Sequence, residues 1–238
     1  MTDAYKPVPP AYRGVWMRTL LETPEGIDDT TFVRWMQLSN WHADLRVPLA
    51  AQALPNSGIK QCSPAQLALL GVQQGFCGVT EVSSDDHGRE LCTWHRQLDY
   101  QPPRPTPDTG AMVFEAPDCV VETGVHGVYR EVWHRLPGSS GRLIGLIEPE
   151  RADGLPSARL LLAGRYLMRV APHSLAGPDF EITFGQLERG VWRIDQSTLP
   201  ELKDQKLACS IQRTSPSSAQ VLGDLGPVNW NILEWTAD

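Results

Sequence analysis

Apolar and polar side chains alternate along a long stretch near the start of the chain. Between Thr30 and Pro48, every second residue from Val33 to Val47 is mostly apolar, and the residues between them are mostly polar. A period of two is typical of a β-strand with one buried face. Because this run is long for a single strand, we expect a bulge or bend near Ser39–Asn40.

The stretch from Arg159 to Val170 alternates in the same way. Its even-numbered positions carry apolar residues or glycine, whereas Arg159, Arg165 and Arg169 occupy odd-numbered positions. This pattern predicts a strand of a sheet with one solvated face, which would carry the three arginines.

Short turn-forming sequences separate many such stretches. The clearest turns are Asp85–Gly88, Pro137–Ser140 and Glu188–Gly190. We count roughly eleven strands, at the spacing found in barrels and sandwiches, and predict an all-β fold, an antiparallel barrel of roughly ten strands.

The sequence predicts one short helix and a single barrel domain. Ser63, followed by a proline, is a good N-cap and predicts a short helix over 63–75. Residues 1–11 form a proline-rich lead-in, and 12–238 are expected to form a single barrel domain. The segment 149–157 is the alternative boundary if there are two domains.

Composition excludes several classes of function. The formal charge of −7 and the absence of basic runs argue against nucleic-acid binding, which requires a dense basic face. No apolar stretch approaches the about 18 residues of a membrane span, and the first residues contain no apolar segment of a secretion signal. The five cysteines have irregular spacings without CxxC, as expected of reduced thiols in a cytoplasmic protein.

A tripeptide pattern carries the candidate chemistry. Three predicted strands contain Trp-x-Arg, at Trp16–Arg18, Trp94–Arg96 and Trp133–Arg135. Side chains two residues apart on a strand point the same way, so an inward tryptophan brings its arginine with it. Tyr129 and Glu131 share the parity of the third pair, and Gln37 accompanies Trp35 in a similar way.

Two interpretations of this pattern stay open. In the first, the barrel encloses a cavity in which Arg18, Arg96 and Arg135 bind an anionic group and the aromatic side chains contact an apolar body. The binding residues would then be Arg18, Gln37, Trp94, Arg96, Tyr129, Trp133 and Arg135. In the second, the arginines stack on tryptophans or pair with Glu131, Asp44 or Asp99, because an unpaired buried charge is too costly.

The segment Gly14-Val15-Trp16 at the start of the first strand resembles the Gly-x-Trp motif of the lipocalin branch of the calycin superfamily. The resemblance implies that Trp16 packs at the closed end of a barrel, with Arg213 from a late strand as a candidate covering partner. It also implies small apolar ligands. The chain is longer than a typical lipocalin and carries its helix early, which suggests an elaborated relative.

The leading hypothesis is therefore non-enzymatic binding of a small amphipathic or aromatic, anionic ligand inside a barrel. An alternative is a lyase- or isomerase-type barrel enzyme that uses Glu131 and Tyr129 as an acid–base pair. A second alternative is a packed barrel that serves as an interaction scaffold through its loops 49–62 and 101–118.

No metal site is predicted, because the six histidines lack the spacing of a ligand set. His42 and Asp44 share the strand face opposite the apolar one and are interpreted as surface residues. We expect no cofactor, with a haem held by one of the histidines as an alternative. The oligomeric state is not indicated by the sequence.

Overall fold

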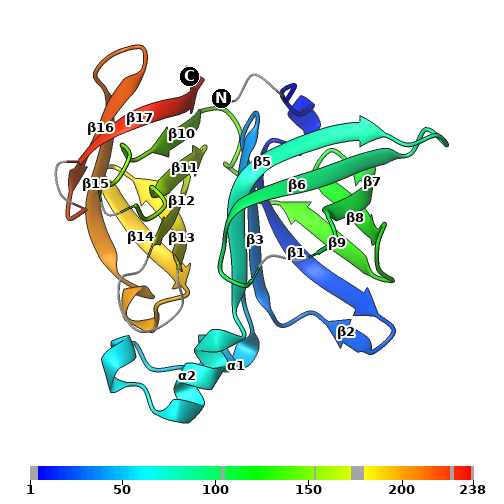
Figure 1. The fold of residues 1–238 in the computed structure, drawn as a ribbon, viewed down its shortest axis with the longest axis horizontal. Coiled ribbons are helices and arrows are strands. Elements are labelled where there is room, and N and C mark those ends of the chain that lie inside the picture. The colour runs from blue at the N-terminus through cyan, green and yellow to red at the C-terminus, as the bar shows by residue number, and fades with distance from the viewer. Residues whose placement is uncertain (1–4, 103–104, 153, 173–179, 226–227, 237–238) are drawn as a thin grey trace.

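The computed structural model describes residues 5–102, 105–152, 154–172, 180–225 and 228–236. These residues form two closed antiparallel β-barrels that lie side by side (Figure 1). The predicted all-β class and antiparallel barrel closure are confirmed. The strands divide, however, between two barrels in place of the single larger one that was expected.

The first barrel comprises β1 (Gly14–Thr23), β3 (Phe32–Gln37), β4 (Trp41–Val47), β5 (Gln74–Ser84), β6 (Glu90–Asp99), β7 (Asp108–Ala116), β8 (Cys119–Gly124) and β9 (Arg130–Arg135). It closes by pairing of β1 with β9, and the short β2 (Gly26–Asp28) extends the sheet beside the end of β1.

The second barrel comprises β10 (Leu143–Ile147), β11 (Arg159–Ala163), β12 (Tyr166–Pro172), β13 (Phe180–Glu188), β14 (Val191–Ser197), β15 (Lys206–Arg213), β16 (Ser218–Gly223) and β17 (Val228–Trp235). The chain passes from the first barrel to the second between β9 and β10. The segment 149–157, considered above as a boundary, connects β10 to β11 within the second barrel.

The helices are short. They are η1 (Pro10–Tyr12), α1 (Leu49–Gln52), η2 (Ile59–Gln61), α2 (Pro64–Gly71) and η3 (Pro200–Leu202). The predicted helix is α2, which begins as expected with Ser63 as N-cap in a reciprocal pair of hydrogen bonds with Gln66. It ends at Gly71, because the chain enters β5 at Gln74.

Two segments expected to be loops contain regular structure. Residues 49–62 include α1 and η2, and β7 forms half of 101–118, whereas residues 103–104 lie outside the described part of the chain.

The stretch from Thr30 to Pro48 forms two strands, not one bent strand. A tight hairpin at Ser39–Asn40 pairs β3 with β4, with Trp35 opposite Asp44. The stretch from Arg159 to Pro172 is likewise a hairpin, of β11 and β12, that turns at Gly164. Gly164 has a φ of +57°, a conformation that favours glycine.

The second barrel covers the outer face of β3, β4 and β5. The shared apolar core includes Met36, Leu45 and Cys77 of the first barrel, packed with Met168 and Phe184 of the second. These strands therefore have both faces buried, one inside their own barrel and one against the neighbour. The continuous core fixes the two barrels against each other.

The interior of the second barrel is filled with apolar side chains. Its largest members are Trp192 and Trp230, which pack with leucine, isoleucine, valine and alanine side chains of the same barrel. The described residues contain no helix long and apolar enough to cross a bilayer.

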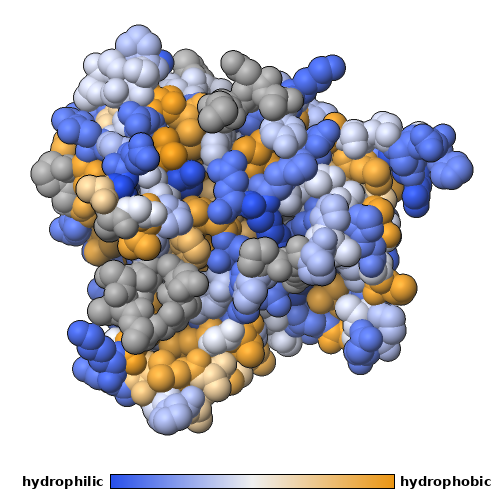
Figure 2. All heavy atoms as spheres, in the orientation of Figure 1, coloured by the Kyte–Doolittle hydropathy of each residue, from blue (hydrophilic) through white to orange (hydrophobic). Residues whose placement is uncertain are grey.

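The two α-helices lie at one end of the molecule, beneath the junction of the barrels (Figure 1). Leu70 of α2 packs with Ile59 and Leu199, but Leu49, Leu67 and Val72 are exposed. Figure 2 shows apolar side chains gathered at this end.

Candidate functional site

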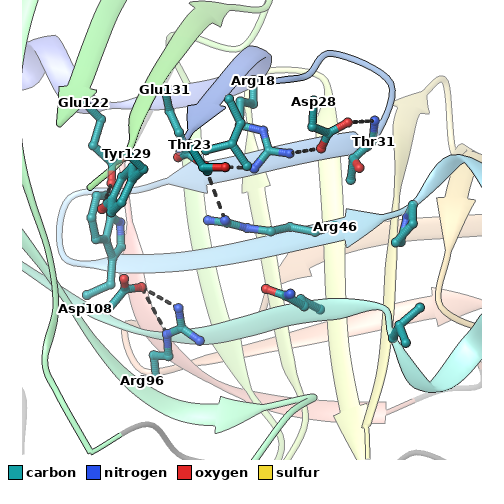
Figure 3. A pocket seen from close by; sticks show the side chains of 15 residues that line it. Arg18, Thr23, Asp28, Thr31, Arg46, Arg96, Asp108, Glu122, Tyr129 and Glu131 are labelled. Atoms are coloured by element: carbon teal, nitrogen blue, oxygen red, sulfur yellow. Dashed lines mark hydrogen bonds and ion pairs between the residues drawn. The ribbon is translucent and has the colours of Figure 1, made fainter. Parts of the chain in front are cut away.

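A cavity of about 330 Å³ opens at one end of the first barrel. Its walls come from the strand ends that meet there, and charged side chains from several strands converge on it (Figure 3). The lining residues are Arg18, Leu21, Thr23, Asp28, Thr31, Arg46, Pro48, Val72, Gln74, Trp94, Arg96, Asp108, Glu122, Tyr129 and Glu131.

An aromatic cluster fills the barrel beneath this cavity. The indole of Trp35 lies 5.4 Å from that of Trp94, 5.8 Å from that of Trp133 and 6.1 Å from that of Trp16, measured between ring centroids. All four side chains belong to one buried core. The cluster therefore limits the cavity to the open half of the barrel.

Arg18 bridges two carboxylates on the cavity wall. Its guanidinium lies 2.8 Å from Glu131 and 2.7 Å from Asp28, and its side chain is only 5% exposed. Burial raises the pKa of Asp28, but hydrogen bonds from Thr30 and Thr31 outweigh this effect and lower the pKa to about 2. Arg18 is thus fully engaged by carboxylates within the protein.

Arg46, on β4, is held in a similar way by carboxylates. Its guanidinium lies 2.8 Å from Asp44 and 3.6 Å from Glu131. Burial opposes the charge of Arg46, but Asp44 and Glu131 outweigh it and raise the pKa of the guanidinium well above its usual value. Burial raises the pKa of Asp44, although Arg46 opposes this shift.

Arg96 completes the set of arginines at the cavity. It donates to Asp108 at 2.6 Å and to Asp99 at 3.0 Å, and its guanidinium stacks 3.6 Å from the centre of the Phe76 ring. Asp108 stands at the start of β7, so this pair links the open ends of β6 and β7.

Glu122 has a different environment. Tyr129 donates its hydroxyl to one carboxyl oxygen at 2.7 Å, and the indole N–H of Trp133 donates to the other at 3.2 Å. Glu122 lies opposite Glu131 in the pairing of β8 with β9. Burial and the nearby Glu131 raise the pKa of Glu122 well above its usual value, and burial together with Glu122 raises the pKa of Tyr129.

The structure brings together most of the residues that the sequence indicated. Arg18, Trp94, Arg96 and Tyr129, with Glu131 of the enzymatic alternative, line the cavity. Trp133 lies directly beneath it, as the donor to Glu122.

Arg135 lies at the opposite end of the barrel. Its guanidinium packs 4.6 Å from the centre of the Trp16 ring and donates to the carbonyl oxygens of Ala11, Arg13 and Pro117. Arg213, expected to cover Trp16, belongs to the second barrel and packs on Trp235. The arginine over Trp16 is therefore Arg135.

Gln37 also lies away from the cavity, at the closed end. It accepts a hydrogen bond from Thr80 and donates to the carbonyl oxygens of Leu38 and Trp41. His42 hydrogen-bonds the same threonine, and its side chain is buried, as is that of Asp44. The interpretation of His42 and Asp44 as surface residues is wrong, because the second barrel covers the other face of β4.

The sequence interpretation missed four charged residues of the cavity, namely Asp28, Arg46, Asp108 and Glu122. Arg46 has the parity of Asp44 on the face that was taken as solvated. Glu122 shares the parity of the buried Val120, a signal that a strand assignment over Cys119–Gly124 would have revealed.

The described residues contain no group of three or more His, Cys, Asp or Glu side chains placed to hold a metal ion. Three of the four carboxyl groups that line the cavity, those of Asp28, Asp108 and Glu131, are instead paired with arginines.

A second hollow, of about 820 Å³, lies beside the first. It follows β6 and the proline-containing segment after it, and reaches Phe180 of the second barrel. The two hollows share Trp94, Arg96 and Asp108. These three residues form the wall between them.

Comparisons with known proteins bear on the fold. No protein family and no curated protein matches the sequence. The crystal structure of an uncharacterized protein, YLR301w from Saccharomyces cerevisiae, is similar over 94% of this chain and 99% of that chain, with a TM-score of 0.59. Only 15% of the residues are identical, so the likeness concerns the fold alone.

Proposed function

We propose that this protein binds a small amphipathic or aromatic molecule at the open end of its first barrel. The observation that supports the proposal most strongly is the cavity itself, in which three arginines and four carboxyl groups surround a space above an aromatic floor. Pockets that combine an apolar base with a few fixed polar groups are typical of small-molecule sites.

The arrangement at the closed end supports a calycin-like origin for this barrel. Trp16 of the Gly-x-Trp motif is buried beneath η1, and its indole donates to the carbonyl oxygen of Tyr12 at 2.7 Å. The arginine packed on it, Arg135, comes from the last strand of the same barrel. Closing one end in this way leaves the other for a ligand, as the family resemblance implies.

The pairing of the arginines bears on the ligand's charge. An anion could bind Arg18 or Arg96 only by displacing a carboxylate that already occupies the guanidinium. Removing one partner of a buried ion pair costs about 3–5 kcal/mol. Among the described residues that line it, the cavity therefore offers no free cation to an anionic group, and the arginines instead fix the walls.

The proposal is tested with protein purified from cells. Native mass spectrometry detects any small molecule that the protein retains. In a second experiment the protein is titrated with decanoate, 3-phenylpropionate or 3-phenylpropylammonium while its tryptophan fluorescence is measured. We expect a retained mass or a saturable change in emission for at least one compound. Neither signal in the wild-type protein would contradict the proposal.

A matched pair of variants assigns any binding to the cavity. Thr23→Phe places a ring at the cavity wall, whereas Thr123→Phe places the same ring on the exposed outer face of β8. Binding should weaken at least tenfold in the first variant and stay within twofold in the second. Equal binding in both would place the site elsewhere.

A second candidate is an enzyme that acts on such a ligand. It is favoured by the hydrogen bond of Tyr129 to Glu122, a buried carboxyl group of raised pKa that can exchange a proton at the cavity. Glu131, by contrast, is engaged by two arginines. If a retained ligand is converted, Tyr129→Phe should abolish conversion and preserve binding, and unchanged turnover would exclude this role.

A further inference from the structure

The charges at the cavity do not balance. Among the residues that the structure describes, six carboxyl groups lie at the cavity or beside its three guanidinium groups, which belong to Arg18, Arg46 and Arg96. The six are Asp28, Asp44, Asp99, Asp108, Glu122 and Glu131. Five of them contact an arginine directly. The surplus of negative charge favours a positively charged occupant.

Glu122 is the carboxyl group of this set that no described arginine contacts directly. In the described part of the chain no ion pair reaches it, and its two hydrogen-bond partners, Tyr129 and Trp133, are neutral donors. Both donors hold the carboxyl in place at the cavity wall. A charged carboxylate in this position would lack the compensation that every other carboxylate of the site has.

The aromatic side chains at the cavity suit a cation. Trp94 and Tyr129 line it together with Glu122. The face of an aromatic ring attracts ammonium groups, with about 0.5–2 kcal/mol for each favourable contact. A metal ion is a poorer candidate, because no three ligating groups converge in the described residues.

From this geometry we infer that the ligand carries a cationic nitrogen, an alkyl- or arylalkylammonium group, which binds in the space bounded by Glu122, Tyr129 and Trp94. This inference rests on the proposed function, since it assigns the chemistry of the same cavity. The ammonium group supplies the positively charged partner that would balance the carboxylate of Glu122, and the apolar part of the ligand lies against Trp94.

Binding of an ammonium group is coupled to the release of a proton from Glu122. Glu122 holds a proton more readily than an exposed glutamate because it is buried and faces Glu131. An ammonium group favours the carboxylate, so the carboxyl proton leaves to solvent as the ion pair forms. The titratable or charged groups that act on Glu122 are Glu131 and Tyr129 of the β9 region, Arg46 of β4, Asp108 of β7, Cys92 of β6 and Tyr12 of η1.

The test uses three probes that differ only in their polar group: 3-phenylpropylammonium, 3-phenyl-1-propanol and 3-phenylpropionate. Isothermal titration calorimetry of the full-length protein measures each dissociation constant. We expect the ammonium compound to bind at least tenfold more tightly than the carboxylate, with the alcohol between them. Calorimetry in buffers of different ionisation enthalpy should report proton release on binding of the ammonium compound only.

Two variants locate the effect. Glu122→Gln should remove the preference for the ammonium compound and the proton release, whereas Glu115→Gln, on the exposed face of β7, should retain both. If Glu122→Gln does not fold, as judged by circular dichroism, Tyr129→Phe serves in its place and should weaken the preference by removing one hydrogen bond to Glu122.

The outcomes separate this inference from the function it rests on. Tighter binding of the carboxylate or the alcohol would overturn the ammonium assignment and leave small-molecule binding intact. Binding of the ammonium compound that is unchanged in Glu122→Gln would also overturn it. No binding of any probe, together with no retained ligand, would overturn both.

Discussion

Arg135 lies opposite Trp16 in the antiparallel pairing of β9 with β1, and its guanidinium packs 4.6 Å from the centre of the indole ring. In the same pairing Arg18 lies opposite Trp133. Neighbouring strands run in opposite directions, so Trp-x-Arg on β1 points its arginine to the open end and Trp-x-Arg on β9 points its arginine to the closed end. The same Trp-x-Arg pattern thus places one arginine in the cavity wall and another over the tryptophan that closes the barrel.

The closed-end contact predicts a purely structural role for Arg135. Arg135→Ala removes the stacking on Trp16 and three hydrogen bonds to carbonyl oxygens. We expect the free energy of unfolding to fall by about 2–4 kcal/mol, because charged hydrogen bonds and cation–π contacts each contribute about 0.5–3 kcal/mol. Urea denaturation measures this loss.

Ligand affinity should be unaffected by the same substitution. Arg135 is separated from the cavity by the tryptophan cluster, so the dissociation constant of any cavity probe should stay within twofold of the wild-type value. Arg135→Lys, which keeps the charge but not the planar group, should recover only part of the stability. A tenfold loss of affinity in either variant would place Arg135 at the binding site after all.

The ion pair of Arg18 with Glu131 predicts strong coupling between the two residues. Arg18→Met leaves Glu131 buried with only the longer contact to Arg46, at 3.6 Å. We expect a loss of about 3–5 kcal/mol in the free energy of unfolding, the usual cost of breaking a buried pair.

A double-mutant cycle measures the coupling. Arg18→Met combined with Glu131→Gln should be less destabilised than the sum of the two single variants, by about 0.5–3 kcal/mol. Additive effects would mean that the two side chains do not stabilise each other, and that the pair holds no part of the cavity wall in place.

The sequence predicted the residue types of the site better than their positions. The parity argument assumed that the three tryptophans face the interior of a barrel, and Trp16, Trp94 and Trp133 are indeed buried. It could not assign Arg18 and Arg135 to different ends, because that requires the number of strands between them. The direction of a strand depends on its place in the sheet, not on its own residues.

Tight hairpins explain why two pairs of strands were interpreted as single strands. In β3 the odd-numbered Trp35 faces its own barrel, and across the hairpin the even-numbered Asp44 takes that face. The odd-numbered Leu45 then faces the second barrel and is equally buried. The odd-numbered residues therefore stay apolar on both sides of the turn, although they face opposite sides of the sheet. They do so because the second barrel buries the outer face, and the sequence pattern does not reveal that second barrel.

The raised pKa of Glu122 predicts a pH dependence of stability. Above the usual pKa of a glutamate, the unfolded chain has lost this proton while the folded protein keeps it, so the folded state binds more protons and stability falls as the pH rises. The fall ends once the pH exceeds the folded-state pKa. Each pH unit of this window is worth about 1.4 kcal/mol.

Glu122→Gln removes this contribution. Relative to the wild-type protein, the variant should therefore gain stability between pH 5 and pH 8, as measured by urea denaturation at both values. His42, whose pKa burial lowers well below its usual value, acts in the opposite direction at acid pH but is common to both proteins. Glu115→Gln is the control, and parallel pH profiles for the wild-type protein and Glu122→Gln would contradict the assignment.

Glu234 forms a polar contact between the two barrels. Its carboxylate, on β17 of the second barrel, accepts hydrogen bonds from the backbone amides of Ser39 at 2.7 Å and Asn40 at 3.1 Å, at the tip of the β3–β4 hairpin. Burial raises the pKa of Glu234, and the amide hydrogen bonds oppose this shift. The contact therefore joins a charged group of one barrel to the turn of the other.

Glu234→Ala leaves both amides without their acceptor. We expect a loss of about 2–4 kcal/mol in the free energy of unfolding, since a hydrogen bond to a charged group contributes about 1.5–3 kcal/mol. Hydrogen exchange at Ser39 and Asn40 should accelerate at least tenfold, while the amides of β12 keep their protection. Glu234→Gln retains an acceptor and should show a smaller effect. Unchanged exchange at the hairpin tip in Glu234→Ala would mean that the apolar core between the barrels alone fixes this turn.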